Sequence, residues 1–411
     1  MRALHRCVAC GSDEFAAQVW GQRPLLTRAA ELPRDYSDLL APGMVDEIIA
    51  ERGVRTPFVR MAREGTLVDR ACFTRSAGFG AQISDQLDPD GVLTQYAAGA
   101  TLVLQGLHRF WPPIIDFVRG MTSDIGHPVQ TNAYITPPAN RGFDPHYDVH
   151  DVFVLQVSGT KRWRVHEPVH HHPLADQPWT DHREAIAERA KDEPVIDTVL
   201  EPGDCLYLPR GWVHSAEAQG DTSIHLTVGV APLTGHDVAT AMIEALASEE
   251  ELRASLPFGL APVDAARSED QTREVLDVLA RLLSEKQDQL SGLAGDALAG
   301  KYLDLTRPAA IRPLATLDAV AALEPDTRLH LREGLHARVD CPDSDVDAGS
   351  PGTVVLRLPT KSVTFPAVCA PALRAVLEGD PVSAGSLPGL DADDGLVVLR
   401  RLLREGVVVA L

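Results

Sequence analysis

The sequence of 411 residues is poor in lysine, cysteine and aromatic residues, and it contains no long uncharged apolar run. Five of its 38 basic residues are lysine, and 58 acidic residues give a formal net charge of -20. Because this charge repels phosphate, we expect no direct binding to nucleic acid or to an anionic membrane, and a basic polypeptide is the favoured partner. The lack of apolar runs and of a signal-peptide pattern, together with six scattered cysteines, predicts a cytoplasmic protein without membrane spans.

The segment from Phe143 to Asp148 carries His146 two residues before an aspartate, and a second histidine, His214, lies downstream. In an extended strand His146 and Asp148 point to the same side, whereas on a helix this spacing would splay them apart. Two neutral imidazoles and one carboxylate occupy one face of an octahedral Fe(II) and leave the other face open for a chelating co-substrate and dioxygen. The pattern therefore predicts a metal site.

A tripeptide of this kind also arises by chance, and the sequence contains a second one, His182-x-Glu184. This second tripeptide lies in a polar stretch that is typical of a surface helix, so we assign it no metal. Cys7-x-x-Cys10 has no second cysteine pair to complete a zinc site. Three consecutive histidines, beginning at His170, do not converge well on one ion.

The sequence around the predicted metal site favours short β-strands. Strands are expected over residues 151–157, 161–166, 205–209 and 223–229, with the first two joined as a hairpin at Ser158-Gly159. A turn at Arg210-Gly211-Trp212 would let His214 project inward. This rhythm of strands and turns predicts a β-sandwich or barrel whose mouth carries the metal.

Several ordered motifs resemble the JmjC-type ribosomal oxygenases of the cupin superfamily, which are Fe(II)- and 2-oxoglutarate-dependent protein hydroxylases. The motifs are Asn132-Ala-Tyr-Ile-Thr-Pro-Pro, His146-Tyr-Asp, Phe153-Val-Leu-Gln-Val-x-Gly-x-Lys161-Arg-Trp163 and Gly203-Asp-x-Leu-Tyr-Leu-Pro-Arg-Gly-Trp-x-His214. The resemblance implies an α+β protein with a double-stranded β-helix core, a helical dimerisation region and a C-terminal winged-helix-like domain. It also implies Fe(II), 2-oxoglutarate and dioxygen as cofactor and co-substrates.

The resemblance makes His146, Asp148 and His214 the iron ligands and Lys161 the partner of the distal 2-oxoglutarate carboxylate. Lysine is scarce in this chain, so a compact ammonium at that position lends slight independent support. The remaining polar pocket residues implied by the resemblance are Tyr134, Asn132 and Thr227. His225 is expected in the core or beside the pocket, and Gly229 departs from the hydroxyl residue that the family often has.

The predicted domains are a catalytic domain over residues 1–232, a helical dimerisation domain over 233–305 and a winged-helix-like domain over 306–411. Leucines at helical spacing in the second domain predict a homodimer. The third domain has 11 basic and 14 acidic residues, so a scaffold role is preferred to DNA binding.

The function predicted from the sequence is hydroxylation of a histidine or arginine side chain, at the β-carbon, in a ribosomal or other basic protein. Two alternatives remain open at this point. One is a 2-oxoglutarate oxygenase that acts on a small natural-product or peptide precursor, and the other is a cupin-like scaffold without enzymatic activity.

Overall fold

The computed structural model describes residues 2–63, 65–138, 144–258, 265–340 and 352–410. They form two compact units, Met1–Pro232 and Leu233–Leu411. Phe143, and the acidic loop beyond Asp340 that begins at Cys341, lie outside the described residues. No helix among the described ranges is long and apolar enough to cross a membrane.

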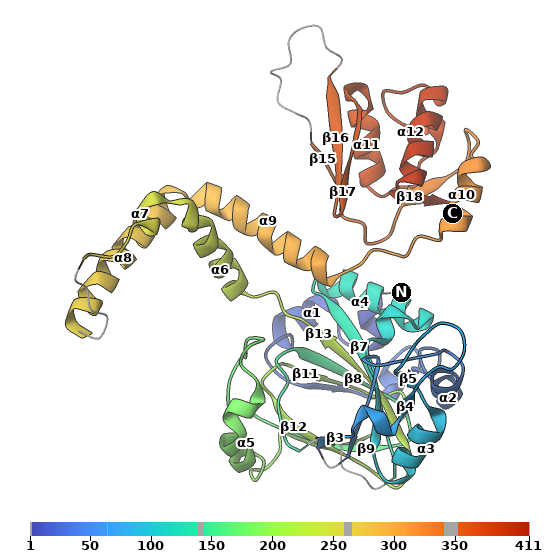
Figure 1. The fold of residues 1–411 in the computed structure, drawn as a ribbon, viewed down its shortest axis with the longest axis vertical. Helices are drawn as coiled ribbons and strands as arrows, with labels where there is room; N and C mark the ends of the chain where they lie inside the picture. The colour runs from blue at the N-terminus through green and yellow to red at the C-terminus, as the bar shows by residue number, and fades with distance from the viewer. Residues whose placement is uncertain (1, 64, 139–143, 259–264, 341–351, 411) are drawn as a thin grey trace. The chain divides into compact units, whose positions relative to one another are not determined.

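The first unit contains an eight-stranded sheet in the order β1-β11-β8-β13-β7-β6-β2-β3 (Figure 1). The strands are β1 (Leu25–Thr27), β2 (Val59–Arg63), β3 (Thr66–Leu67), β6 (Thr101–Leu104), β7 (Val129–Thr136), β8 (Asp151–Ser158), β11 (Cys205–Leu208) and β13 (Ser223–Val230). The central strands β8 and β13 are buried along most of their length because both faces of the sheet are covered. Their runs of valine, leucine and isoleucine suit this environment.

A three-stranded sheet, β10-β9-β12, makes the other half of this core. Its strands are β9 (Lys161–His166), β10 (Ile196–Leu200) and β12 (Val213–Ala218). The predicted strands at 151–157 and 161–166 are present, but the predicted hairpin between them is wrong. β8 pairs with β11 and β13, whereas β9 pairs with β10 and β12, so the turn at Gly159 carries the chain from one sheet to the other.

Helices and short extended segments cover the outer face of the large sheet. These are η1 (Leu4–Arg6), α1 (Ser12–Gln18), η2 (Ala29–Glu31), α2 (Pro42–Ala50), η3 (Arg70–Cys72), β4 (Thr74–Arg75), β5 (Gln86–Leu87), α3 (Pro89–Ala97), η4 (Leu107–Arg109) and α4 (Pro112–Ile125). In α4, Ile114, Phe117, Val118 and Met121 are buried at helical spacing. Two further elements, η5 (Trp179–His182) and α5 (Arg183–Arg189), confirm the polar helix expected around His182.

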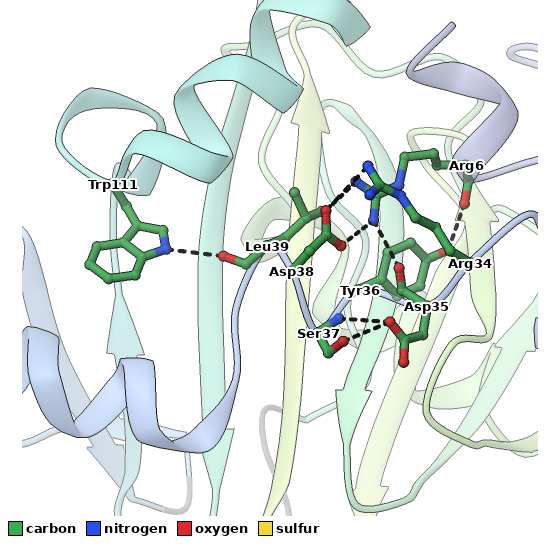
Figure 2. Close-up of polar contacts among 8 residues, drawn as sticks. All are labelled: Arg6, Arg34, Asp35, Tyr36, Ser37, Asp38, Leu39 and Trp111. Atoms are coloured by element: carbon green, nitrogen blue, oxygen red, sulfur yellow. Dashed lines mark hydrogen bonds and ion pairs between the residues drawn. The ribbon is translucent and has the colours of Figure 1, made fainter. Parts of the chain in front are cut away.

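A buried arginine fixes the N-terminal segment to this layer (Figure 2). The guanidinium of Arg6 donates two hydrogen bonds to the carboxylate of Asp38, at 2.6 and 3.1 Å, and one to the backbone carbonyl of Asp35, at 2.8 Å. The hydroxyl of Tyr36 donates to the backbone carbonyl of Arg6 at 2.9 Å. Arg6 is 5% exposed, whereas the Asp38 side chain is 40% exposed, so solvent reaches this bidentate pair from the side of the carboxylate.

The second unit begins with helices α6 (Gly235–Ala245), η6 (Leu246–Ser248), α7 (Glu250–Arg253), α8 (Ala265–Glu285) and α9 (Gln287–Leu305). Leu246, Leu282 and Leu290 form the buried centre of this helical part. The remaining elements are α10 (Pro313–Ala321), β14 (Leu329–Leu331), β15 (Arg338–Asp340), β16 (Thr353–Leu358), β17 (Lys361–Pro366), η7 (Ala367–Cys369), α11 (Ala370–Leu377), η8 (Ala384–Ser386), α12 (Ala392–Arg404) and β18 (Val408–Ala410). They pack around a separate apolar core, with sheets β15-β16-β17 and β14-β18.

Candidate metal centre and co-substrate pocket

The backbone register places the two predicted histidine ligands opposite each other. His146 and His214 form an isolated antiparallel bridge, with N–H to O distances of 3.1 Å from His146 to His214 and 2.8 Å in the reverse direction. The backbone N–H of Gly211 donates to the carbonyl of Asp148 at 3.0 Å and holds the next part of the same segment. One ligand atom from each of His146, Asp148 and His214 lies within 4.8 Å of the others.

Backbone carbonyls orient both imidazoles. Nδ1 of His146 lies 2.7 Å from the carbonyl oxygen of Asp144, and Nδ1 of His214 lies 3.0 Å from that of Trp212. A carbonyl oxygen only accepts hydrogen bonds, so each Nδ1 carries the proton and each Nε2 keeps its lone pair. Such fixed tautomers are the usual arrangement of histidines that bind a metal through Nε2.

Burial and neighbouring charges shift the pKa values of two of the three candidate ligands, His214 and Asp148. Burial, with a smaller contribution from His146, lowers the pKa of His214 to about 4, so its imidazole is neutral at physiological pH. Burial by itself would raise the pKa of Asp148. The attraction of His150, His214, His146 and Arg60 outweighs that effect and holds the pKa of Asp148 below its usual value.

The triad lies in a cavity of about 260 Å³ between the two sheets. The cavity is lined by Arg60, Thr101, Tyr134, Thr136, His146, Asp148, Val152, Val154, Lys161, Trp163, Trp179, His214, Ala216, His225 and Thr227. Most of these residues come from strands of the two sheets, and Asp148 is the one carboxylate among the lining residues.

Lys161 places a buried cation in the same cavity. Its side chain is 2% exposed, and its Nζ donates to Oγ1 of Thr136 at 3.1 Å. Among the described residues, none forms a salt bridge with Lys161. Burial without such a partner lowers the pKa of Lys161 to about 7. The cavity thus offers an open set of metal ligands and a cation that lacks an anion.

The region that carries most of this cavity is similar to known proteins. Residues 109–238 match the family model of the JmjC domain. The chain is 32% identical over 217 residues to ribosomal oxygenase 1 of Bos taurus, covering 53% of this chain and 31% of that protein. It is 27% identical over 314 residues to the bifunctional lysine-specific demethylase and histidyl-hydroxylase NO66 of Culex quinquefasciatus, covering 71% of this chain and 45% of that protein. Residues 109–238 thus match a JmjC domain, and the chain is similar to ribosomal oxygenase 1 and to NO66 over part of its length.

Solved structures show the same fold. The structure of YcfD, a ribosomal oxygenase from Escherichia coli, in complex with cobalt and 2-oxoglutarate covers 97% of this chain and 98% of that chain, with a TM-score of 0.51 and 16% identity. This likeness confirms the predicted cupin fold of the JmjC domain. The chain spans less than half the length of ribosomal oxygenase 1 of Bos taurus and of NO66 of Culex quinquefasciatus.

The JmjC domain brings most of the predicted pocket residues together. Tyr134 and Thr227 line the cavity with the triad and Lys161. The ring of Tyr134 stacks on that of His225 at 5.0 Å, and burial raises the pKa of the Tyr134 hydroxyl. Asn132 is not among the lining residues, and its side-chain oxygen instead accepts a hydrogen bond from the backbone N–H of Gly106 at 2.9 Å.

Several residues that line the cavity were not predicted from the sequence. Arg60 comes from β2, far upstream of the metal motif, and Trp179 comes from η5. Thr136, whose hydroxyl accepts a hydrogen bond from Lys161, lies within the motif that starts at Asn132, so the motif contained a signal for it. Nothing local to Arg60 or Trp179 indicates that they face this cavity.

Proposed function

We propose that the protein is an Fe(II)- and 2-oxoglutarate-dependent oxygenase that hydroxylates a side chain of a protein. The observation that carries this proposal is the combination, in one cavity, of the open His146, Asp148 and His214 set with the buried ammonium of Lys161. The three ligand atoms suit a divalent iron, and Lys161 suits the distal carboxylate of 2-oxoglutarate. A scaffold protein needs neither feature.

The oxidising chemistry belongs to the bound iron with 2-oxoglutarate and dioxygen, which together supply the power to replace a C–H hydrogen by a hydroxyl. The chain supplies the remaining parts. His146 and His214 present Nε2 with fixed tautomers, and Lys161 with Thr136 would orient the co-substrate from the opposite end of the cavity. Apolar walls from Val152 and Val154 limit access of water.

The charges of the cavity favour a neutral target side chain. Arg60 and Lys161 are both cationic, and the one lining carboxylate, Asp148, is assigned to the metal. An arginine side chain, which is always charged, would enter without a carboxylate partner among the lining residues. A histidine enters as a neutral imidazole. We therefore propose β-carbon hydroxylation of histidine, in a basic ribosomal protein encountered in the cytoplasm.

The helical part of the second unit supports the proposal of a homodimer. Leu276 and Leu283 lie one heptad apart on α8 and are 57% and 36% exposed, and Leu293 on α9 is 45% exposed. Within one chain these leucines lack the burial that Leu282 has, so a second copy of this surface would remove them from water. The third predicted domain, residues 306–411, would then serve as a scaffold and not as a DNA-binding module.

The metal and co-substrate assignments are tested by 2-oxoglutarate binding to purified protein loaded with Fe(II) without oxygen. We expect the wild type to bind, and His146→Ala to lose binding by at least about tenfold, since a metal ligand is removed. His171→Ala is the matched control, because His171 is an exposed histidine outside the cavity. Equal binding by wild type and His146→Ala would refute the assignment.

The substrate is tested by intact-mass analysis of ribosomal proteins from cells with and without the enzyme. A shift of about 16 Da, one added oxygen, located by fragmentation on a histidine, is the expected result. A shift on arginine would contradict the choice of side chain. An unchanged mass profile, combined with activity on a free metabolite, would support a natural-product oxygenase instead.

A further inference from the structure

The second unit contains a groove that the proposed oxygenase reaction does not use. It lies between α12 on one side and the end of β17 with η7 on the other. Its volume of about 480 Å³ is within the range of roughly 300–1,000 Å³ that is common for ligand sites. The lining residues are Thr364, Phe365, Pro366, Val368, Cys369, Leu390, Asp394, Val397, Val398, Arg400, Arg401 and Arg404.

Apolar side chains line both sides of this groove. Phe365 and Val398 are buried and belong to the apolar core of residues 320–408. Val368 of η7 and Val397 of α12 come from the two sides of the groove and are 58% and 62% exposed. Exposed apolar side chains that line a hollow are typical of a binding surface, because a partner removes them from water. The groove is therefore suited to an apolar side chain of a ligand.

The groove is also basic. Arg400, Arg401 and Arg404 line it, and Asp394 is the one carboxylate among the lining residues. Nε of Arg401 donates a hydrogen bond to the carboxylate of Glu405 at 2.8 Å. Among the described residues, neither Arg400 nor Arg404 has a hydrogen bond or ion pair. Two guanidinium groups are thus available to carboxylates of a ligand, which arginine binds through two parallel hydrogen bonds.

We propose that this groove docks an acidic segment of a partner protein, and that the segment carries a large aliphatic or aromatic side chain. This side chain would enter between Val368 and Val397, and neighbouring carboxylates of the segment would bind Arg400 and Arg404. The net charge of the whole chain is -20, so long-range electrostatics repel such a segment. Its recognition must therefore come from these short-range contacts.

The lining favours a polypeptide over a nucleic acid. Single strands of nucleic acid are bound by basic side chains together with aromatic rings on which the bases stack. Phe365 is the one aromatic residue among the lining residues, and it is buried in the core. Residues 306–411 also carry more acidic than basic side chains. A nucleic acid would therefore find charge in the groove but no exposed ring to stack on.

The test is a selection from a phage-displayed library of random peptides of about a dozen residues on the immobilised full-length protein. The library is first passed over the variant Arg400→Glu/Arg404→Glu, so that peptides bound elsewhere, including in the metal cavity, are removed. We expect the enriched peptides to combine several acidic residues with leucine or phenylalanine. In fluorescence anisotropy, synthetic copies should bind this variant at least about tenfold more weakly than the wild type, since hydrogen bonds between charged groups are lost.

A matched control is Arg312→Glu/Arg328→Glu, which makes the same change of charge at two exposed arginines of the second unit outside the groove. It should bind the peptides as the wild type does. Val368→Ser/Val397→Ser keeps every charge and should weaken binding by about tenfold, because the apolar sides of the groove are lost. Thermal unfolding checks that the variants are folded, and if one groove variant unfolds, the other decides the test.

The proposal is overturned if no peptide is enriched, if the enriched peptides are basic, or if they bind a folded groove variant as tightly as the wild type. An equal loss of binding in the control pair would show an effect of net charge alone and would also overturn it. A changed mass of Arg400→Glu/Arg404→Glu in light scattering would assign the groove to a second copy of the chain. Binding of a single-stranded oligonucleotide that this variant loses would assign it to nucleic acid. None of these measurements depends on metal or 2-oxoglutarate binding.

Discussion

Lys161 makes the cavity sensitive to pH. Its pKa of about 7 in the folded apoprotein lies below the value of about 10.4 expected in the unfolded chain. Between these values the unfolded chain binds more protons, so the free energy of unfolding of the apoprotein should rise as pH increases from 7 to 10. Binding of the 2-oxoglutarate carboxylate requires the ammonium form, so affinity should fall with pH across the same window.

Lys161→Met is the variant that checks this dependence. It removes a buried cation, so we expect the apoprotein to be more stable than the wild type near pH 7 and its pH dependence above 7 to flatten. We also expect 2-oxoglutarate to bind about 10- to 100-fold more weakly, since hydrogen bonds to charged groups contribute about 1.5–3 kcal/mol. Calorimetry of unfolding and of 2-oxoglutarate binding measures both effects. Unchanged affinity would remove Lys161 from the co-substrate site.

At the scale of elements, the turn between β8 and β9 determines how the two sheets join. Gly159 has φ of 62°, and a Cβ there would lie 2.1 Å from the carbonyl oxygen of Thr222. Gly159→Ala should therefore lower the free energy of unfolding by more than the cost of the backbone conformation alone, about 1–3 kcal/mol. Gly220→Ala is the matched control, because Gly220 also has a positive φ but no atom within 4 Å of the added Cβ. Chemical denaturation measures the free energy of unfolding of both variants, and an equal loss in Gly159→Ala and Gly220→Ala would contradict this account.

The exposed leucines of α8 permit a test of the dimer that leaves the fold intact. Leu276→Glu combined with Leu283→Glu should convert the protein to a monomer in light scattering at micromolar concentration, with the helical content unchanged. Leu282 is not suited to this test, because it is 4% exposed and packs with Leu246 and Leu290 within the chain. A charge at Leu282 should unfold the helical part. A monomeric wild type, or a dimer that survives the double change, would refute the dimer.

At the scale of the whole molecule, the net charge of -20 should draw basic substrates toward the protein. We expect kcat/KM for a basic protein substrate to fall as ionic strength rises, because salt screens this attraction. The KM for 2-oxoglutarate, whose partner Lys161 is buried, should change much less. Steady-state kinetics at two salt concentrations measure both. A kcat/KM that does not respond to salt would show that the surface charge does not steer the substrate.

The sequence was sufficient to predict the metal ligands and the strands, which short local motifs encode. It was not sufficient to predict strand pairing or cavity residues from distant segments, which depend on the tertiary structure. The ordered motifs around His146 and His214 indicated the triad, and β-branched runs indicated strands. Which sheet each strand joins depends on long-range pairing, so the hairpin at Gly159 was predicted wrongly. Arg60 lines the cavity of the candidate metal site and comes from a segment with no motif of its own.

The bridge between His146 and His214 joins the two ends of the segment 147–213, so a metal bound by both histidines would cross-link these ends. Ions that bind only the folded protein stabilise it by about 2.7 kcal/mol at a concentration of 100 times Kd. The amide hydrogens of these two residues, each bonded to the other's carbonyl, therefore serve as built-in reporters of occupancy. Metal should slow the exchange of these two amide hydrogens with deuterium more than the exchange of amides in the separate core around β15, β16 and β17. Hydrogen exchange would therefore report metal binding without an assay of turnover.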